Sequence, residues 1–257
     1  MILYPMLISA IVVFFTLFYA SYLDIKNRRV PFTTWYPMLI VGFPASIFIL
    51  YSGFFETPLF FIATTLIFCV FLYILGKIHV FGGADVFALI CISLCVPIYP
   101  FTPMLGMSPT GFFAVSVLIN SLLISMLIPI VIFSINALRG NNAPLICMFS
   151  GFPVNGNTIR QEWGFVMEEF EENGDVVTRK FIGAFDSIKR MYTGKGRIYT
   201  KDLREHPAEF ALELSMYRKA GTVWISYAVP FIIPITIGFV SAIVFGDFLF
   251  AIIGMLV

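Results

Sequence analysis

The sequence predicts an all-α polytopic membrane protein with six transmembrane helices and a small α+β cytoplasmic insert between helices five and six. Three observations support this prediction. Of the 257 residues, 59% are hydrophobic and 12% are charged, whereas soluble domains carry about 25% charged residues. Several apolar stretches approach the roughly 20 residues that cross a bilayer, and the cations are confined to particular connections. The formal net charge of +1 argues against a nucleic-acid partner.

Six apolar segments are predicted to cross the membrane, the fourth being short. They are Ile2–Leu23, Trp35–Phe54, Pro58–Gly76, Val86–Pro100, Phe112–Leu138 and Val223–Val257. The first lacks the basic start of a cleaved signal peptide and is expected to be retained. Pro230 and Pro234 favour a kink in the last, because each removes a helix hydrogen bond. The predicted domains are residues 1–138 (helices one to five), 139–221 (the insert) and 222–257 (helix six).

The distribution of lysine and arginine predicts the orientation. All 16 of them follow segments one, three or five, and the connections after segments two and four contain none. Cytoplasmic loops are enriched in these residues. The protein is therefore expected in the cytoplasmic membrane, with both termini outside and the insert inside.

The insert is predicted to contain a β-hairpin and a helix. Two strand-like runs flank Asn173-Gly174-Asp175, a combination typical of hairpins. The stretch His206–Gly221 has Pro207 near its start and basic residues at its end, which indicates an amphipathic helix.

The sequence lacks the residues that metal sites, serine hydrolases and phosphate-binding sites require. The cysteines (Cys69, Cys91, Cys95, Cys147) form no CxxC pair, and His79 and His206 are too scattered for a usual zinc site. The chain contains no GxSxG, no HExxH and no phosphate-binding loop. We therefore expect no metal and no cofactor.

Two aspartates stand at predicted helix ends on the same side of the membrane. Asp24 ends the first segment and Asp85 begins the fourth, whereas Glu56 falls in an outer loop and Asp247 in the last segment or at its bend. A charge in the apolar layer costs about 2.5–3.5 kcal/mol and usually has a function. Two adjacent carboxyls share a proton, so one can act as a general base and the other as an acid.

Structural roles explain the same residues equally well. Asp85 can cap the helix that it begins, where aspartate is preferred. Asp24 can pair with Lys26 or Arg28 at the membrane interface, and the glycines before Asp85 can be loop residues. The residues alone leave both interpretations open.

A family resemblance favours catalysis. "GGAD" at Gly82–Asp85 resembles the GxGD motif of membrane aspartic proteases, and "DIKNRRVPF" at Asp24–Phe32 resembles the segment after the first catalytic aspartate of type IV prepilin peptidases. The predicted topology, six passes with an insert before the last pass, resembles that of archaeal preflagellin (prearchaellin) peptidases. The stretch "PFIIPITIGF" in the sixth segment is similar to their last helix.

The resemblance implies roles for these residues. Asp24 and Asp85 match the catalytic pair, and Gly82 and Gly83 match the flexible turn, with Ala84 in place of the motif's second glycine. The substrates would be archaellin or type IV pilin-like precursors, cut after a short basic class III signal peptide at the cytoplasmic face. Phe87 replaces a frequent lysine, and the paired CxxC motifs that accompany methyltransferase activity are absent, which implies a peptidase alone.

A cluster of acids at the predicted hairpin has two interpretations. It is a solvated tip, or it attracts the basic leader of the substrate by charge complementarity. Its members are Glu168, Glu169, Glu171, Glu172 and Asp175.

Rival functions remain open. Paired carboxyls can relay protons in a transporter, although transporters usually place them near the midplane within repeats. A non-catalytic assembly scaffold and an intramembrane protease of the signal-peptide-peptidase kind also use such helices. Besides the precursor, membrane lipid is the expected partner.

Overall fold

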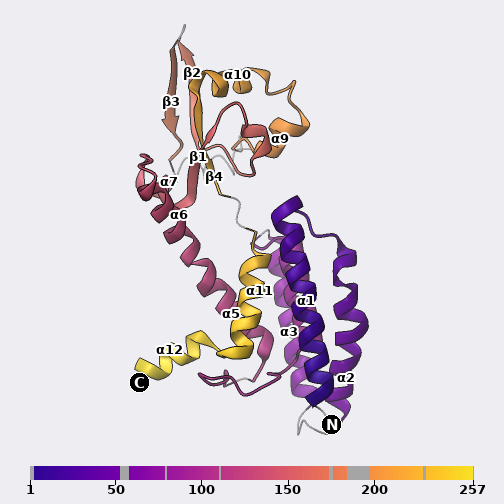
Figure 1. The fold of residues 1–257 in the computed structure, drawn as a ribbon. Helices are drawn as coiled ribbons and strands as arrows, with labels where there is room; N and C mark the ends of the chain where they lie inside the picture. The colour runs from indigo at the N-terminus through magenta and orange to yellow at the C-terminus, as the bar shows by residue number, and fades with distance from the viewer. Residues whose placement is uncertain are drawn as a thin grey trace. The chain divides into compact units, whose positions relative to one another are not determined.

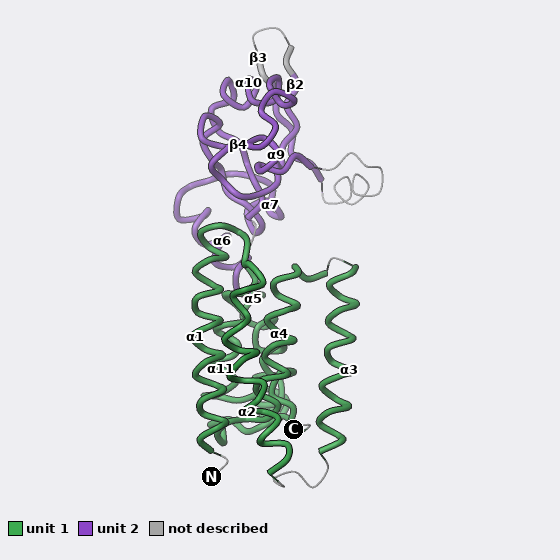
Figure 2. The backbone as a smooth tube through the Cα atoms, turned by 90° about the vertical axis from the view of Figure 1, so that its right-hand side faces the viewer, with its two compact units in different colours: residues 1–126, 230–257 green, residues 127–229 purple. Residues whose placement is uncertain are grey.

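The computed structural model describes residues 3–52, 58–78, 80–109, 111–173, 176–183, 197–227 and 230–256. It is mostly helical and divides into two compact units (Figures 1 and 2). Unit 1 comprises Met1–Met126 and Pro230–Val257, and unit 2 comprises Leu127–Val229.

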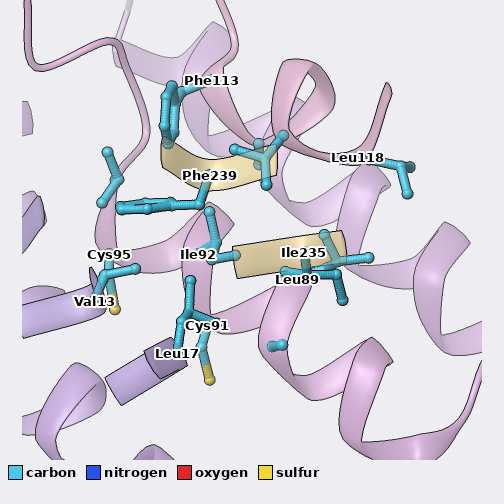
Figure 3. Packing of buried hydrophobic residues seen from close by; sticks show 14 of the residues in the cluster. Val13, Leu17, Leu89, Cys91, Ile92, Cys95, Phe113, Leu118, Ile235 and Phe239 are labelled. Carbon is cyan, nitrogen blue, oxygen red and sulfur yellow. The ribbon is translucent and has the colours of Figure 1, made fainter. Parts of the chain in front are cut away.

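Unit 1 is a helical bundle. Its α-helices are α1 (Leu3–Asn27), α2 (Phe43–Tyr51), α3 (Pro58–Lys77), α4 (Gly83–Cys95), α5 (Phe113–Ser125), α11 (Ile232–Val244) and α12 (Phe248–Leu256). A 3₁₀ turn, η1 (Phe32–Trp35), and a π-helical stretch, η2 (Met38–Gly42), lead into α2. One apolar core joins α1, α4, α5 and α11 through residues such as Leu17, Leu89, Phe113 and Ile235 (Figure 3).

The described helices agree with a multi-pass membrane protein, but six spans are not confirmed. Four helical stretches are long and apolar enough to cross a membrane: Leu3–Asn27, Phe32–Tyr51, Pro58–Lys77 and Phe113–Leu138. The pair α11 and α12 makes a fifth if a bend of 56° is accepted within one span. The fourth predicted segment contains α4, which has 13 residues and is short of the roughly 20 that a span requires.

The bend in the last segment lies away from its prolines. Pro230 precedes α11 and Pro234 lies in its first turn, where a missing N–H costs no helix hydrogen bond. The helix instead ends before Gly246, whose φ is +95° and where a side chain would collide with the Gly106 carbonyl. The expected proline kink is therefore replaced by a glycine break.

Unit 2 combines helices with two small antiparallel sheets. Its α-helices are α6 (Leu127–Leu138), α7 (Leu145–Ser150), α9 (Thr200–Glu205) and α10 (Ala211–Ala220), with a 3₁₀ turn at Ile159–Gln161. Strand β1 (Gly151–Asn155) pairs with β4 (Thr222–Ser226), and β2 (Glu168–Asn173) pairs with β3 (Val176–Phe181). The hairpin pairing confirms that prediction, while residues 174 and 175 at its tip lie outside the described residues.

Two boundaries in this region differ from the prediction. Residues Thr222–Ser226, assigned to the last membrane helix, form β4, and its Val223 and Ile225 are buried in the core of unit 2. A short apolar run suits a buried strand as well as a helix, which explains the error. The helix predicted from His206 begins only at Ala211, because His206 ends α9 and a turn follows it.

Candidate active site

The first aspartate lies in the last turn of α1. Asp24 is half-buried, the backbone N–H of Ile232 donates to its carboxylate, and Arg28 interacts with it electrostatically. Near this contact the hydroxyls of Ser21 and Thr236 lie 2.8 Å apart. The carboxyl of Asp24 is thus held against the start of α11, a contact with a backbone group that no side-chain pattern predicts.

The second aspartate lies in the first turn of α4. Asp85 is half-buried, and its Oδ2 accepts the Gly82 N–H at 3.1 Å. A Cβ added to Gly82 would lie 2.8 Å from that oxygen, whereas one added to Gly83 would meet no atom within 4 Å. Gly82 therefore gives the carboxyl room to approach its backbone, and the two glycines are not equivalent.

The structure brings the two aspartates together. Helices α1 and α4 contact each other, and the carboxyls of Asp24 and Asp85 interact electrostatically. Leu17 on α1 and Leu89 on α4 belong to the core shown in Figure 3. Because both residues lie less than two helical turns from the aspartates, the same packing that joins the helices positions the carboxyls.

Both structural alternatives for these residues are present in part. The Gly82 N–H bond makes Asp85 a helix-capping residue, and Arg28 accompanies Asp24. Lys26, in contrast, points its Nζ to the Tyr22 hydroxyl at 3.5 Å. A cap satisfies one oxygen of Asp85 and leaves capacity for a second contact, so capping and acid–base chemistry are compatible.

Aromatic side chains pack against one another in the segments close to the two aspartates in the chain. The ring of Phe87 meets that of Phe32 edge-to-face at 5.1 Å, and Phe32 meets Tyr36 in the same way at 5.8 Å. Phe81 lies 5.3 Å from Phe231, next to the start of α11. Phe81 and Phe87 are neighbours of Asp85 in the chain, and Phe231 precedes Ile232, whose N–H donates to Asp24.

The acidic side chains of the predicted hairpin do not all lie on one exposed surface. Glu168 is 3% exposed, and its Oε2 accepts the Trp224 N–H at 2.7 Å. The inclusion of Glu168 among leader contacts is therefore wrong. Glu169 and Glu171 are exposed, as alternation along β2 requires, and that alternation is the signal that separates them from Glu168. The side chain of Glu172, and Asp175 altogether, lie outside the described residues.

Asp247 takes no part in the site. Asp247 is buried at the break between α11 and α12, where its Oδ2 accepts the Ser116 hydroxyl at 2.7 Å. Glu56 and His79 are outside the described residues. Among the residues that the structure describes, no three His, Cys, Asp or Glu side chains gather as a metal site would require.

Comparison with known proteins gives the site its context. A family model described as the type IV leader peptidase family matches residues 11–135, which include both aspartates. A second, described as the archaeal peptidase A24 C-terminus type II, matches residues 143–248. A preflagellin peptidase of Methanocaldococcus jannaschii is 24% identical over 242 residues, which cover 89% of each chain. The chain belongs to the archaeal preflagellin and type IV prepilin (leader) peptidase family.

Proposed function

We propose that this protein is a membrane aspartic endopeptidase that removes the short basic class III signal peptide from archaellin or type IV pilin-like precursors. The observation that carries the proposal is the meeting of Asp24 and Asp85, which come from distant parts of the chain. Both lie within residues 11–135, which match the leader peptidase family. The substrate class follows from the preflagellin peptidase that resembles most of the chain.

The chemistry follows from two carboxyls that share one proton. The ionised carboxylate takes a proton from water, whose oxygen attacks the scissile carbonyl carbon, while the protonated carboxyl donates its proton to the carbonyl oxygen. When the tetrahedral intermediate collapses, the C–N bond breaks, the leaving amine takes up a proton from the pair, and one hydroxyl of the intermediate returns its proton to the pair as the C=O bond re-forms. The products are a new carboxyl terminus and a new amino terminus, and the pair again holds one proton.

The position of the pair suits a cut beside an apolar helix. Asp24 precedes Lys26, Arg28 and Arg29, the basic connection that the distribution of cations assigns to the cytoplasmic side. A precursor whose basic leader stays on that side and whose apolar helix enters the bilayer would present their junction at this depth. Glu169 and Glu171 are exposed, and their negative charge would attract the basic leader.

The decisive experiment compares cleavage of a precursor by wild type, Asp24→Asn and Asp85→Asn in membranes, with the new N-terminus read by mass spectrometry. We expect wild type to cut directly before the apolar helix and both variants to insert stably without cutting. Retention of most activity by either variant would make that aspartate a structural residue. A cut inside the apolar helix would indicate an intramembrane protease, and no cut of any precursor would favour a transporter or scaffold.

A further inference from the structure

The chain reverses its direction where α6 ends. The stretch Phe113–Leu138 is long and apolar enough to cross a membrane, and Arg139 is the first charged residue after it. Gly140 follows with a φ of +68°, as is common just after a helix. The Asn141 N–H then donates to the Asn136 carbonyl at 3.0 Å. The chain therefore turns back at the point where the span ends.

Helix α7 returns along the last turns of α6, and the two helices contact each other (Figure 1). The ring of Phe149 in α7 stacks on that of Phe133 in α6, with 4.5 Å between the ring centroids. Phe133 precedes Leu138 by five residues, which is about 7.5 Å along the helix. The end of α7 thus lies level with the last turns of the span, on the membrane side of Arg139.

The carbonyls at the end of α7 are satisfied by protein groups. The amide of Asn136, which is 1% exposed, donates from Nδ2 to the carbonyls of Met148 at 2.9 Å and Gly151 at 2.7 Å. The Ser150 hydroxyl donates to the Ile146 carbonyl at 2.7 Å. At the end of a helix in water such carbonyls can be left to the solvent, whereas within lipid each needs a partner in the protein. These three carbonyls meet that requirement.

The two sides of α7 differ in what they contact. Cys147 is 4% exposed and packs with Trp224 in a core cluster of unit 2. Leu145 and Ile146 are 68% and 63% exposed, and Leu138 at the end of α6 is 88% exposed. Single exposed apolar residues are ordinary, but these lie beside a membrane span. The apolar surface of α6 therefore continues onto α7.

We propose that α7 is an interfacial membrane helix, with Leu145 and Ile146 in the lipid beside α6. The apolar faces of such helices lie about 5–10 Å into the boundary between headgroups and acyl chains. Unit 2 is then attached to the bilayer by α7 as well as by α6. Strand β1, which begins directly after α7, is held close to the lipid surface. This inference does not depend on the peptidase function.

The test places an environment-sensitive fluorescent amino acid at one position at a time in the full-length protein. The protein is reconstituted in phosphatidylcholine–phosphatidylglycerol vesicles, with or without brominated acyl chains that quench a probe in contact with them. Position 146 is tested. Ile130 on α6, 55% exposed, supplies the lipid-facing reference, and Leu212 on α10, 63% exposed, supplies the water-facing control. Helix α10 packs on the strands β2, β3 and β4 and lies away from α6 within unit 2 (Figure 1).

We expect brominated chains to quench the probe at position 146 about half as strongly as at position 130, because an interfacial helix lies only about 5–10 Å into the boundary. The probe at position 212 should not be quenched. Equal behaviour of positions 146 and 212 would show that α7 faces water, and the proposal would be overturned. A blue-shifted but unquenched probe at position 146 would overturn it too, because protein rather than lipid would then cover α7.

A second pair of variants tests how α7 is held. Asn136→Ala removes the donor of the Met148 and Gly151 carbonyls, which should then move toward water, and quenching at position 146 should fall at least about twofold. Quenching at position 130 should stay unchanged, which separates a local release of α7 from unfolding. Asn142→Ala alters an exposed neighbour and should leave both positions as in wild type. Unchanged quenching at position 146 in Asn136→Ala would overturn the role of Asn136 in holding α7.

Discussion

Asp85 and Asp247 occupy similar positions in unit 1, and their surroundings differ. Each begins an apolar helix shortly after a glycine. Asp247 is 3% exposed, its Oδ1 accepts the Phe250 N–H at 3.0 Å, and its Oδ2 accepts the Ser116 hydroxyl at 2.7 Å. Ser116 in turn accepts a hydrogen bond from Tyr99. Both oxygens of Asp247 are therefore matched with donors inside the protein.

Asp85 has one hydrogen-bond donor and interacts electrostatically with a second acid. Its Oδ2 accepts the Gly82 N–H, and its electrostatic neighbour is the carboxyl of Asp24. Buried polar groups in stable structures are normally satisfied by partners, as Asp247 is. A carboxyl that interacts electrostatically with a second carboxyl is instead suited to exchange a proton. The position before an apolar helix thus permits a structural or a chemical role, and the partners decide which.

The strongest test of this difference replaces each aspartate by asparagine. Asp85→Asn should lower precursor cleavage by at least about 10³-fold, because an amide cannot exchange the proton. Asp247→Asn should keep activity within about threefold, because an amide still accepts one hydrogen bond and Ser116 can turn its hydroxyl. Rates are measured on equal amounts of folded protein in detergent. Comparable losses in both variants would show that the two carboxyls do not differ in role.

The glycine pair before Asp85 gives a finer test. The Cβ of Gly82→Ala would lie 2.8 Å from Asp85 Oδ2, so the carboxyl must move, and a displacement of this size can cost about 10²-fold in rate. Gly83→Ala places its Cβ in open space, and we expect a loss of about threefold or less. The measurement is kcat/KM with one precursor.

Equal effects of the two alanines would mean that chain flexibility, rather than the position of the carboxyl, is what the glycines provide. Both backbones can accommodate alanine, since neither glycine has a positive φ. The comparison therefore isolates the contact with Asp85 from conformational strain.

Asp247→Ala should act on stability rather than on chemistry. It leaves the Phe250 N–H and the Ser116 hydroxyl without their acceptor, and each unsatisfied buried group costs about 1–3 kcal/mol. We expect a lower unfolding temperature in detergent for this variant and an unchanged one for Asp85→Asn. An Asp247→Ala protein as stable as wild type would show that water replaces the lost partner.

The sequence predicts the aspartate pair but not its support. Asp24 ends one apolar segment and Asp85 begins another on the side with the cations, and in the structure the two carboxyls interact electrostatically, while their catalytic role stays a prediction. The Ile232 N–H contact to Asp24 involves a backbone group from the other end of the chain, which no local pattern reveals. Residues 222–226 show the same limit, since a short run with three consecutive apolar residues indicates burial but not whether membrane or protein provides it.

Glu168 extends the comparison to a buried carboxyl of unit 2. Its Oε2 accepts the Trp224 N–H, and Arg179 Nε lies 4.0 Å from Oε1. Burial raises the pKa of Glu168 above its ordinary value of 4.5, although Trp224 and Arg179 oppose the shift. The partners of Glu168 thus compensate its burial only in part.

The sign of the resulting pH effect follows from linkage. Between the ordinary pKa of 4.5 and the higher pKa of the folded state, the folded protein binds more protons than the unfolded chain, so stability falls as pH rises. Glu168→Gln removes this titration and keeps an oxygen for the Trp224 N–H. We therefore expect the variant to gain stability relative to wild type as pH rises from 4.5. The difference in unfolding temperature, variant minus wild type, should increase over this range. The measurement is thermal unfolding in detergent across this range. A difference that decreases with pH would mean that Trp224 and Arg179 favour the charged form, and Glu168 would then resemble a fully matched carboxylate.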